Sequence, residues 1–416
     1  MSFQRAFRFV ILGTLFLVLL QRSEIEINDP VERVRAFTRS IEFDYATWVL
    51  DAWEEKIGQI GLGAADYLDN GSQKSLVLDY LDTVTEIQQK ETILQEYYTN
   101  PDVVNPEAET LLIRKNLESL YEKRSLLAPL AEAVLQNQIS AVIADKGLTL
   151  GGQPLPPLMF HITPLPMNLI VSPRDVIRQD ADISLNPNIT VDQITALEDK
   201  VDHGLNVSSL VVPVGGIGLY PTMVMQTSNL NWLLEVISHE WTHNYLDLRP
   251  LGLSYYASPE LRTMNETTAN ISGKEIGAAV IERYYPEFVP PPKPEEKPPM
   301  PEKASEPPAF DFRAAMHETR VTVDKMLVEG KIEEAESYME SQRRMFWDHG
   351  YHIRKLNQAY FAFYGAYADV PGGAAGEDPV GAAVRTLRAQ SNSLVEFLNR
   401  ISWMWSFEQL KTAIRK

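Results

Sequence analysis

Hydrophobic residues recur at intervals of three and four along most of the first third of the chain. The pattern holds over residues 31–61 and 106–147, and Asn-Gly and Asn-Pro pairs interrupt it. Because an α-helix places residues three and four apart on one face, this pattern predicts a helical N-terminal region over residues 28–150. The region shows no cluster of metal-binding residues, so we expect it to be a scaffold or a partner surface.

The pattern changes after residue 150. Residues 151–187 and 209–226 combine prolines, β-branched residues and short apolar runs, which are typical of β-strands. Residues 190–204 lie between them and predict a short helix, because they begin with a threonine cap and an acidic turn and end at a glycine. The glycine-rich residues 214–226 favour either an edge strand that can pair with an extended peptide or a simple turn.

Two longer helices are predicted next. Residues 229–248 are apolar on most faces, with Ser228 as a suitable N-cap and Arg249-Pro250 as an end signal, so this helix is expected to be largely buried. The second helix covers residues 259–285, and Pro286 marks its end. It begins with Ser258-Pro259, a serine cap followed by proline at the first helical position.

The last part of the chain is again helical after a proline-rich interruption. Residues 287–309 are so rich in proline that they exclude a helix and predict an extended spacer. A docking site for a proline-recognising module is the alternative. Residues 310–416 predict a helical C-terminal lobe, so the expected fold class is α+β and mostly helical.

Composition narrows the possible functions. The 416-residue chain carries a formal net charge of −18, and such an acidic chain lacks the basic surface that nucleic-acid binding requires. The chain has no cysteine, which excludes thiolate nucleophiles, disulfides and cysteine-bound zinc. Any metal ion must therefore be bound by His, Asp or Glu.

Residues 1–27 have the pattern of a targeting segment. Arg5 and Arg8 precede an almost wholly apolar run from Phe9 to Leu20, which suits a signal peptide or signal anchor better than a full membrane span. No small-x-small cleavage site follows the run, so we favour an uncleaved anchor that places the rest of the chain outside the cytoplasmic membrane. Cleavage would give a secreted protein, and a buried N-terminal helix is the less favoured alternative.

The segment 235-EVISHEWTHNYLD-247 places His239 and His243 four residues apart. On a helix, their imidazoles project from one face about one turn apart, close enough to bind one tetrahedral zinc ion. Glu240 is rotated by about 100° from His239, so it can reach a metal-bound water without being a ligand. A helix whose histidines are merely packed or solvated is the alternative. The remaining histidines, among them His161, have no ligand-spaced partner and are expected to be structural or solvated.

A candidate for the third ligand lies on the next predicted helix. Glu266, Asn270, Gly273 and Gly277 fall on one stripe at spacings of four, three and four. The glutamate can complete a zinc site, the asparagine can hydrogen-bond an imidazole, and the glycines allow another helix to approach closely. Glu235, one turn before the first histidine, is a rival that we expect to support the site without binding the metal.

HEWTH followed by 265-NETTAN resembles the gluzincin, thermolysin-like branch of zinc metallopeptidases, over roughly 60 residues. The resemblance implies a zincin-like catalytic core in which His239, His243 and Glu266 bind Zn²⁺ and Glu240 is the general base. Asn270 departs from the family, which usually has an aspartate there to orient a ligand histidine, so metal affinity is the property in doubt. A weaker likeness is to predicted bacterial aminopeptidases of this branch.

The resemblance also implies a mechanism. Zinc lowers the pKa of its bound water and polarises a carbonyl, while Glu240 takes the proton and passes it to the leaving amine. Gluzincins stabilise the oxyanion with a tyrosine, histidine or arginine from the C-terminal lobe. Tyr360 and Tyr364 are the favoured candidates here, and His352 and Arg354 are further ones. The alternative for each tyrosine is a place in the core.

These observations predict a membrane-anchored or secreted zinc peptidase of bacterial type that binds one Zn²⁺ per chain and acts on peptide or protein substrates. The alternative is a noncatalytic zincin-like envelope protein that serves as a binding or scaffold module. Retention of Glu240 favours the enzyme, whereas Asn270 favours the alternative. The predicted segments are a targeting segment (1–27), a helical region (28–150), a zincin lobe (151–286), a spacer (287–309) and a helical lobe (310–416).

Overall fold

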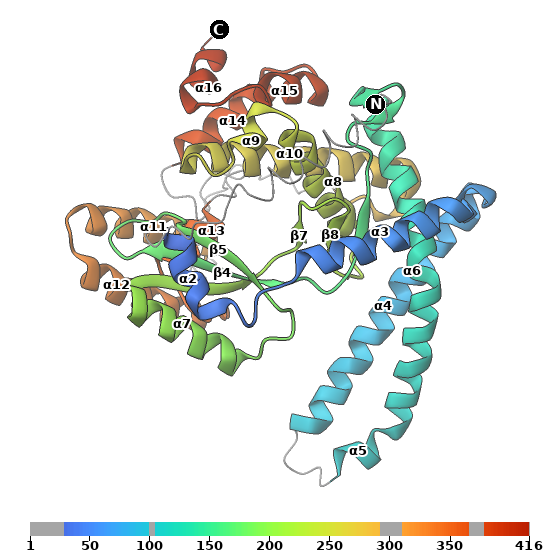
Figure 1. Ribbon diagram of the computed structural model, residues 1–416, viewed down its shortest axis with the longest axis horizontal. Helices are drawn as coiled ribbons and strands as arrows, with labels where there is room; N and C mark the ends of the chain where they lie inside the picture. The colour runs from blue at the N-terminus through green and yellow to red at the C-terminus, as the bar shows by residue number, and fades with distance from the viewer. Residues whose placement is uncertain (1–28, 100–104, 292–309, 366–377, 416) are drawn as a thin grey trace, which may run out of the picture.

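The computed structural model describes residues 29–99, 105–291, 310–365 and 378–415. The predicted targeting segment and most of the predicted spacer lie outside the described residues. Across the described part, the protein is mostly helical and contains three small sheets, so the expected α+β, mostly helical class is confirmed (Figure 1).

The helices of the described residues fall into three groups along the chain. The first group is α2 (Pro30–Thr38), α3 (Tyr45–Leu62), η1 (Ala64–Tyr67), α4 (Asn70–Thr99), α5 (Pro106–Glu109) and α6 (Leu111–Asp145). The second is α7 (Val191–Leu205), α8 (Leu230–Asp247), α9 (Pro250–Leu253), α10 (Pro259–Tyr284) and η2 (Pro286–Phe288). The third is α11 (Phe312–Val328), α12 (Ile332–Asp348), α13 (Gln358–Tyr364), α14 (Pro379–Ala389), α15 (Leu394–Ile401) and α16 (Phe407–Ile414).

Among the described residues, the strands lie in or within two residues of the two segments where the sequence predicts them, and β1 falls just before the first segment. They are β1 (Thr149–Leu150), β2 (Gln153–Pro154), β3 (Phe160–Ile162), β4 (Met167–Pro173), β5 (Ala181–Leu185), β6 (Val207–Pro213), β7 (Gly216–Ile217) and β8 (Thr222–Val224). β1 pairs with β2, and the two larger sheets have the strand orders β5-β4-β6 and β3-β8-β7. β7 is therefore the edge strand next to α8.

The antiparallel sheet β5-β4-β6 buries side chains on both faces. Leu169 of β4 lies opposite Ile183 and Val211, and this face packs against α2 and α7. Ile170, the next residue of β4, packs with Phe363 of α13 on the other face. This follows from strand geometry, because successive side chains point to opposite sides of a sheet.

The most extensive core surrounds α8 and α10, which pack against each other. Helices α4, α6, α14, α15 and α16 also contribute to it (Figure 1). Trp241 of α8 and Ile276 of α10 are fully buried there, and Thr242 Oγ1 of α8 lies 3.0 Å from Ser272 Oγ of α10. The two helices predicted to carry the metal ligands are therefore held side by side.

The predicted C-terminal lobe divides between two cores. α11, α12 and α13 share a hydrophobic cluster, and α13 also covers one face of the β5-β4-β6 sheet. α14, α15 and α16 instead join the core around α10. Helical structure was predicted correctly here, but the division depends on contacts between distant segments, which helical periodicity does not specify.

Residues 31–61 form two helices rather than one continuous stretch. The Phe43 N–H donates to Ser184 O at 3.0 Å, and Glu42 forms a β-bridge with Leu185, so the chain between the helices is extended along β5. Asp44 then starts α3 by accepting the Thr47 N–H. As a result, α2 packs on the sheet with α7, whereas α3 packs against α6.

α7 begins at the predicted threonine cap, Thr190, but continues past the predicted glycine end. Gly204 lies inside the helix, where an added Cβ would come within 2.8 Å of the Phe37 ring. The helix ends at Asn206, which adopts a left-handed conformation with φ of 53°. Asparagine tolerates this conformation better than most residues, so it can end a helix in place of glycine.

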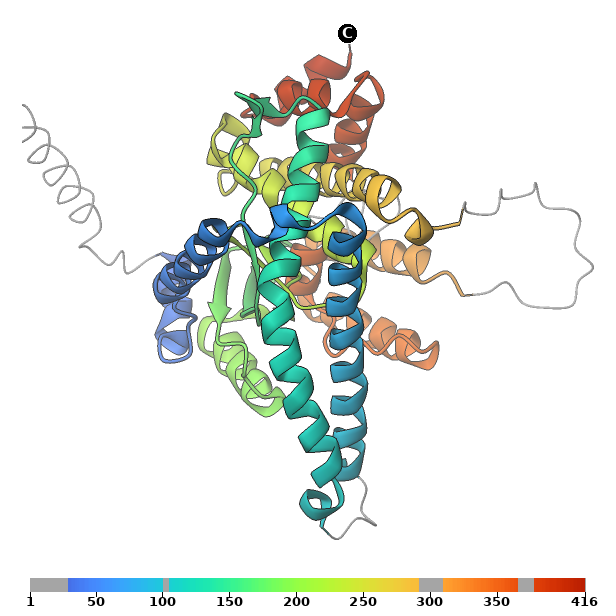
Figure 2. The same cartoon turned by 90° about the vertical axis from the view of Figure 1, so that its right-hand side faces the viewer.

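α4 and α6 form a long antiparallel pair that projects from the rest of the molecule, with α5 at its tip (Figures 1 and 2). Among the described helices, α6 is long and apolar enough to span a membrane. Its inner face, including Val134 and Ile139, is buried in the main core. Helices in the core of a globular protein can have the same length and composition.

Candidate metal centre

α8 presents the two histidines of the HEWTH segment. Asn229, rather than the predicted Ser228, caps this helix, because its side-chain oxygen accepts the Trp232 N–H at 3.1 Å. The helix then continues to Asp247. His239 and His243 lie one turn apart, and their Nε2 atoms are 3.0 Å from each other.

α10 brings Glu266 to the two histidines. Ser258 caps this helix and Pro259 occupies its first position, as predicted. Glu266 Oε2 lies 3.6 Å from Nε2 of His239 and 3.6 Å from Nε2 of His243. The three side chains predicted as ligands therefore converge from two neighbouring helices on one point.

Glycines on α10 set the distance between the two helices. A Cβ at Gly273 would lie 2.8 Å from Glu235 O and 3.0 Å from His239 Cβ, and one at Gly277 would lie 3.0 Å from Glu235 N. The predicted close approach of another helix at these glycines is confirmed. The Glu235 side chain does not line the cavity around the ligands, and its supporting role stays a prediction.

The arrangement of the three groups fits a tetrahedral ion. Ligand atoms about 2.0–2.1 Å from zinc at tetrahedral angles lie about 3.3 Å apart, which is close to the 3.0, 3.6 and 3.6 Å observed. Glu266 Oε2 is also buried without a hydrogen-bond partner, which is unusual for a buried carboxylate oxygen. Two imidazole nitrogens and one carboxylate oxygen are a donor set typical of catalytic zinc sites.

Asn265 orients one of the imidazoles. Its Oδ1 lies 2.8 Å from His243 Nδ1, and because an amide oxygen only accepts, Nδ1 carries a proton and Nε2 is the ring nitrogen that would bind a metal. No pattern in the sequence indicates this role, although Asn265 stands directly before Glu266. Asn270 lies one turn after Glu266 and is half-buried. Its predicted hydrogen bond to an imidazole stays a prediction.

The charges of the ligand candidates depend on one another. Burial lowers the pKa of His243, but the Glu266 carboxylate outweighs this effect and raises the pKa to about 9. Burial raises the pKa of Glu266, yet the two histidines hold it well below its usual range. A divalent cation would displace the His243 proton, so we expect its binding to weaken as the pH falls.

Glu240 lies in the same cavity as the ligand candidates. The side chain is 6% exposed, and burial raises its pKa to about 7. A carboxylate with a pKa near neutrality is well suited to take and return a proton. The cavity has a volume of about 490 Å³, and the edge strand β7 contributes to its wall through Gly216 and Ile217. Of the predicted segment 214–226, Gly216–Ile217 forms an edge strand, whereas β8 is the central strand of the same sheet.

We expect Gly216→Ala to impair catalysis more than stability. The new Cβ would lie 2.6 Å from Glu240 Cγ and 2.6 Å from its Oε1, so the flexible glutamate must move while the backbone stays in place. A displacement of about 1 Å can cost about 10²-fold in rate. Peptide turnover and the melting temperature should be measured on the same sample. Gly58→Ala is the control because nothing lies within 4 Å of its new Cβ, and equal turnover in both variants would contradict the expectation.

The predicted oxyanion-stabilising tyrosines do not reach this cavity. α13 contributes Phe363 to its wall, whereas Tyr360 and Tyr364 contact each other with ring centroids 4.5 Å apart and pack in the core beside the sheet. Both tyrosines therefore belong to the core, which was the alternative expected for each of them. Arg354 is likewise engaged elsewhere, in an ion pair with Glu198.

Tyr255, for which the sequence pattern predicts no role, contacts a ligand candidate. It lies between α9 and α10, and its hydroxyl hydrogen-bonds Glu266 Oε1. Arg262 donates from Nε to the same hydroxyl at 3.3 Å. The sequence could have indicated that Arg262 lies near the site, because a residue four positions before Glu266 on a helix lies on the same face.

A second cluster of possible ligands joins the N-terminal helices to β3. His161 Nδ1 lies 3.1 Å from Glu132 Oε1, and its Nε2 lies 3.4 Å from Glu55 Oε2, so this histidine has a structural role, as one of the two expected alternatives predicts. The partners come from segments distant in sequence. Lys56 Nζ is already 2.5 Å from Glu132, and its positive charge makes this cluster an ion-pair network rather than a metal site.

The candidate site thus consists of two imidazoles and one carboxylate that face one point, with a buried glutamate in the same cavity. In comparisons with known proteins, no family model matches the sequence, and no curated protein and no solved structure matches the chain.

Proposed function

We propose that the protein is a zinc-dependent peptidase of the gluzincin type with a zincin-like catalytic core. The convergence of His239, His243 and Glu266 on one point carries this proposal. The position of Glu240 in the same cavity adds a group able to move a proton. The order of strands, histidine helix and glutamate helix along the chain also supports it.

The residues have distinct roles in the proposed reaction. His239, His243 and Glu266 would hold the ion, and Asn265 orients one imidazole. When bound, zinc would lower the pKa of a water molecule and polarise the substrate carbonyl. Glu240 takes the proton of the attacking water and returns it to the leaving amine, for which a pKa near 7 is well suited.

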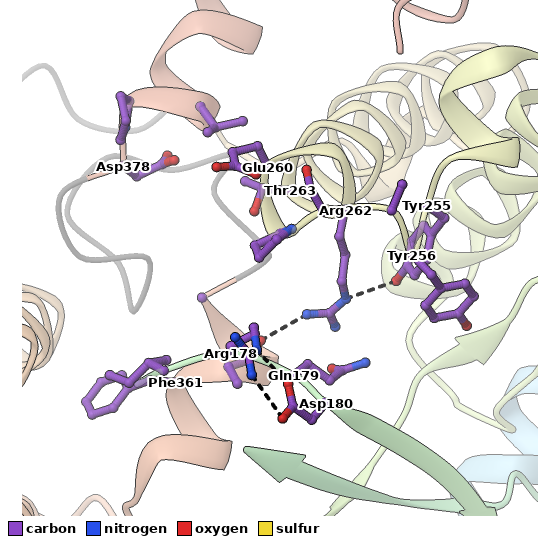
Figure 3. A pocket seen from close by; sticks show the side chains of 18 of the residues that line it. Arg178, Gln179, Asp180, Tyr255, Tyr256, Glu260, Arg262, Thr263, Phe361 and Asp378 are labelled. Atoms are coloured by element: carbon purple, nitrogen blue, oxygen red, sulfur yellow. Dashed lines mark hydrogen bonds and ion pairs between the residues drawn. The ribbon is translucent and has the colours of Figure 1, made fainter. Parts of the chain in front are cut away.

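The space around the site supports a peptide substrate. β7 is an edge strand with backbone groups on which an extended chain can add. The cavity around the ligands adjoins a second cavity of about 680 Å³, and both are lined by Tyr255, Tyr256 and Arg262 (Figure 3). This combined space favours a polypeptide over a single amino acid. We also propose that residues 1–27 anchor the protein in the membrane or, after cleavage, direct its secretion.

The full chain should be tested for metal and for hydrolysis on one sample. We expect one zinc ion per chain and cleavage of a fluorescently labelled unfolded protein, with loss on chelation and recovery on adding zinc. Glu266→Ala should weaken zinc binding by more than about 100-fold, because loss of a ligand exceeds the loss of an outer partner. Glu235→Ala is the matched control and should retain zinc. A parent protein without zinc would refute the proposal.

A further inference from the structure

A chain of hydrogen bonds ends on the third ligand candidate. Arg262 and Glu266 lie one turn apart on α10, and Tyr255 precedes this helix. Arg262 Nη1 donates to Ala362 O at 2.9 Å, its Nε donates to Tyr255 Oη at 3.3 Å, and this hydroxyl contacts Glu266 Oε1. Figure 3 shows Arg262 between the tyrosine and the backbone of the facing segment.

The direction of these hydrogen bonds is fixed by chemistry. A guanidinium group has donors and no acceptor, so the Tyr255 oxygen must accept from Arg262. The hydroxyl then donates its single hydrogen to Glu266 Oε1. The other oxygen, Oε2, is buried, has no hydrogen-bond partner and lies 3.6 Å from both imidazole Nε2 atoms.

We infer that Tyr255 and Arg262 are positioning residues that hold the plane of the Glu266 carboxylate, so that one oxygen faces the metal while the tyrosine engages the other. Without the tyrosine, the carboxylate could turn about its terminal bond and present one or both oxygens to the ion. The hydrogen bond to Oε1 removes this freedom and leaves Oε2 as a single ligand atom. The inference deepens the proposed function and rests on it, because it assigns a role to these residues only at a metal site.

Arg262 also connects the site to the other side of the substrate space. Its guanidinium is buried, with 9% of the residue exposed, and it lines both cavities. Ala362, which accepts its second hydrogen bond, belongs to α13, the helix that covers the β5-β4-β6 sheet. The Glu266 carboxylate is therefore fixed relative to the helices of the main core and also to the sheet side of the cleft.

Tyr255→Phe tests the inference, with Tyr256→Phe as the matched control. Tyr256 lines the same cavities but is 85% exposed. Loss of an outer partner typically weakens metal binding by about 10–100-fold, so we expect this weakening in Tyr255→Phe and parental affinity in Tyr256→Phe. Zinc affinity is measured by competition with a chelator. The melting temperature of the zinc-free protein is measured in parallel, so that a loss of stability from the missing hydrogen bond is separated from a loss of zinc affinity.

Arg262→Lys supplies a second test that does not remove the tyrosine. Lysine keeps the charge but cannot hold Ala362 O and Tyr255 together with a planar group, so zinc affinity should fall although the charge is kept. If Tyr255→Phe does not fold, this variant decides the question. If the folded Tyr255→Phe variant binds zinc with the affinity of the parent protein, the inference is overturned and the proposed function is not. A parent protein that binds no zinc would overturn the proposed function as well.

Discussion

Glu240→Gln is expected to lower peptide turnover by about 10²–10⁴-fold, the usual contribution of a general base. Glutamine has nearly the same size and can still accept a hydrogen bond, but it cannot take up the proton of the attacking water. Glu240 is buried and is not among the three converging groups, so the variant should keep one zinc ion per chain. Turnover of one fluorogenic peptide and the zinc content should be measured together.

Glu275→Gln is the matched control for this loss. Glu275 lies on α10 as well, but it pairs with Arg388 of α14 and does not line the cavity. Turnover should therefore stay near that of the parent. If zinc-loaded parent and Glu240→Gln protein both fail to cleave any peptide of a broad library, the noncatalytic binding module becomes the better description of this protein.

Local sequence signals predicted the site helices well. Helix start and end signals depend on only one or two residues. α10 begins at Ser258-Pro259, and α8 ends just before Arg249-Pro250. The i, i+4 spacing of His239 and His243 also fixes their relative position within one helix. The convergence with Glu266 was anticipated because the glycine stripe on α10 permitted close helix packing, and Gly273 lies against the α8 backbone.

Contacts between distant segments were not predictable in this way. The break between α2 and α3 arises because Phe43 hydrogen-bonds a strand about 140 residues later, and no local signal specifies that partner. The spacing of Tyr360 and Tyr364 on one helix face suits the wall of a cleft. The same spacing suits a core, and only the elements that pack against the helix decide between the two. Tyr255 was missed for the same reason, since only folding places it beside Glu266.

Lys56→Met is expected to lower the free energy of unfolding by about 3–5 kcal/mol at neutral pH, the range for breaking a buried ion pair. Lys56 of α3 and Glu132 of α6 are each 1% or less exposed, and their charged atoms are 2.5 Å apart. The variant leaves the carboxylate with His161 and the Ile162 N–H as partners. Chemical denaturation of the parent and variant measures the difference.

The effect should shrink at acid pH. Burial raises the pKa of Glu132, but Lys56 and His161 outweigh burial and lower it from 4.5 to about 2. Because the folded pKa is the lower one, this contribution to stability is present above pH 4.5 and is lost as the pH falls toward 2. The gap between parent and variant should therefore be wide at pH 7 and narrower at pH 4.

Two controls separate the buried charge from the loss of a lysine as such. Lys74 pairs with Glu287 at the surface, so Lys74→Met should change stability little. Adding Glu132→Gln to Lys56→Met should recover part of the loss, because a neutral amide needs no counter-charge. A Lys56→Met protein as stable as Lys74→Met at pH 7 would show that this network does not hold α3 against α6.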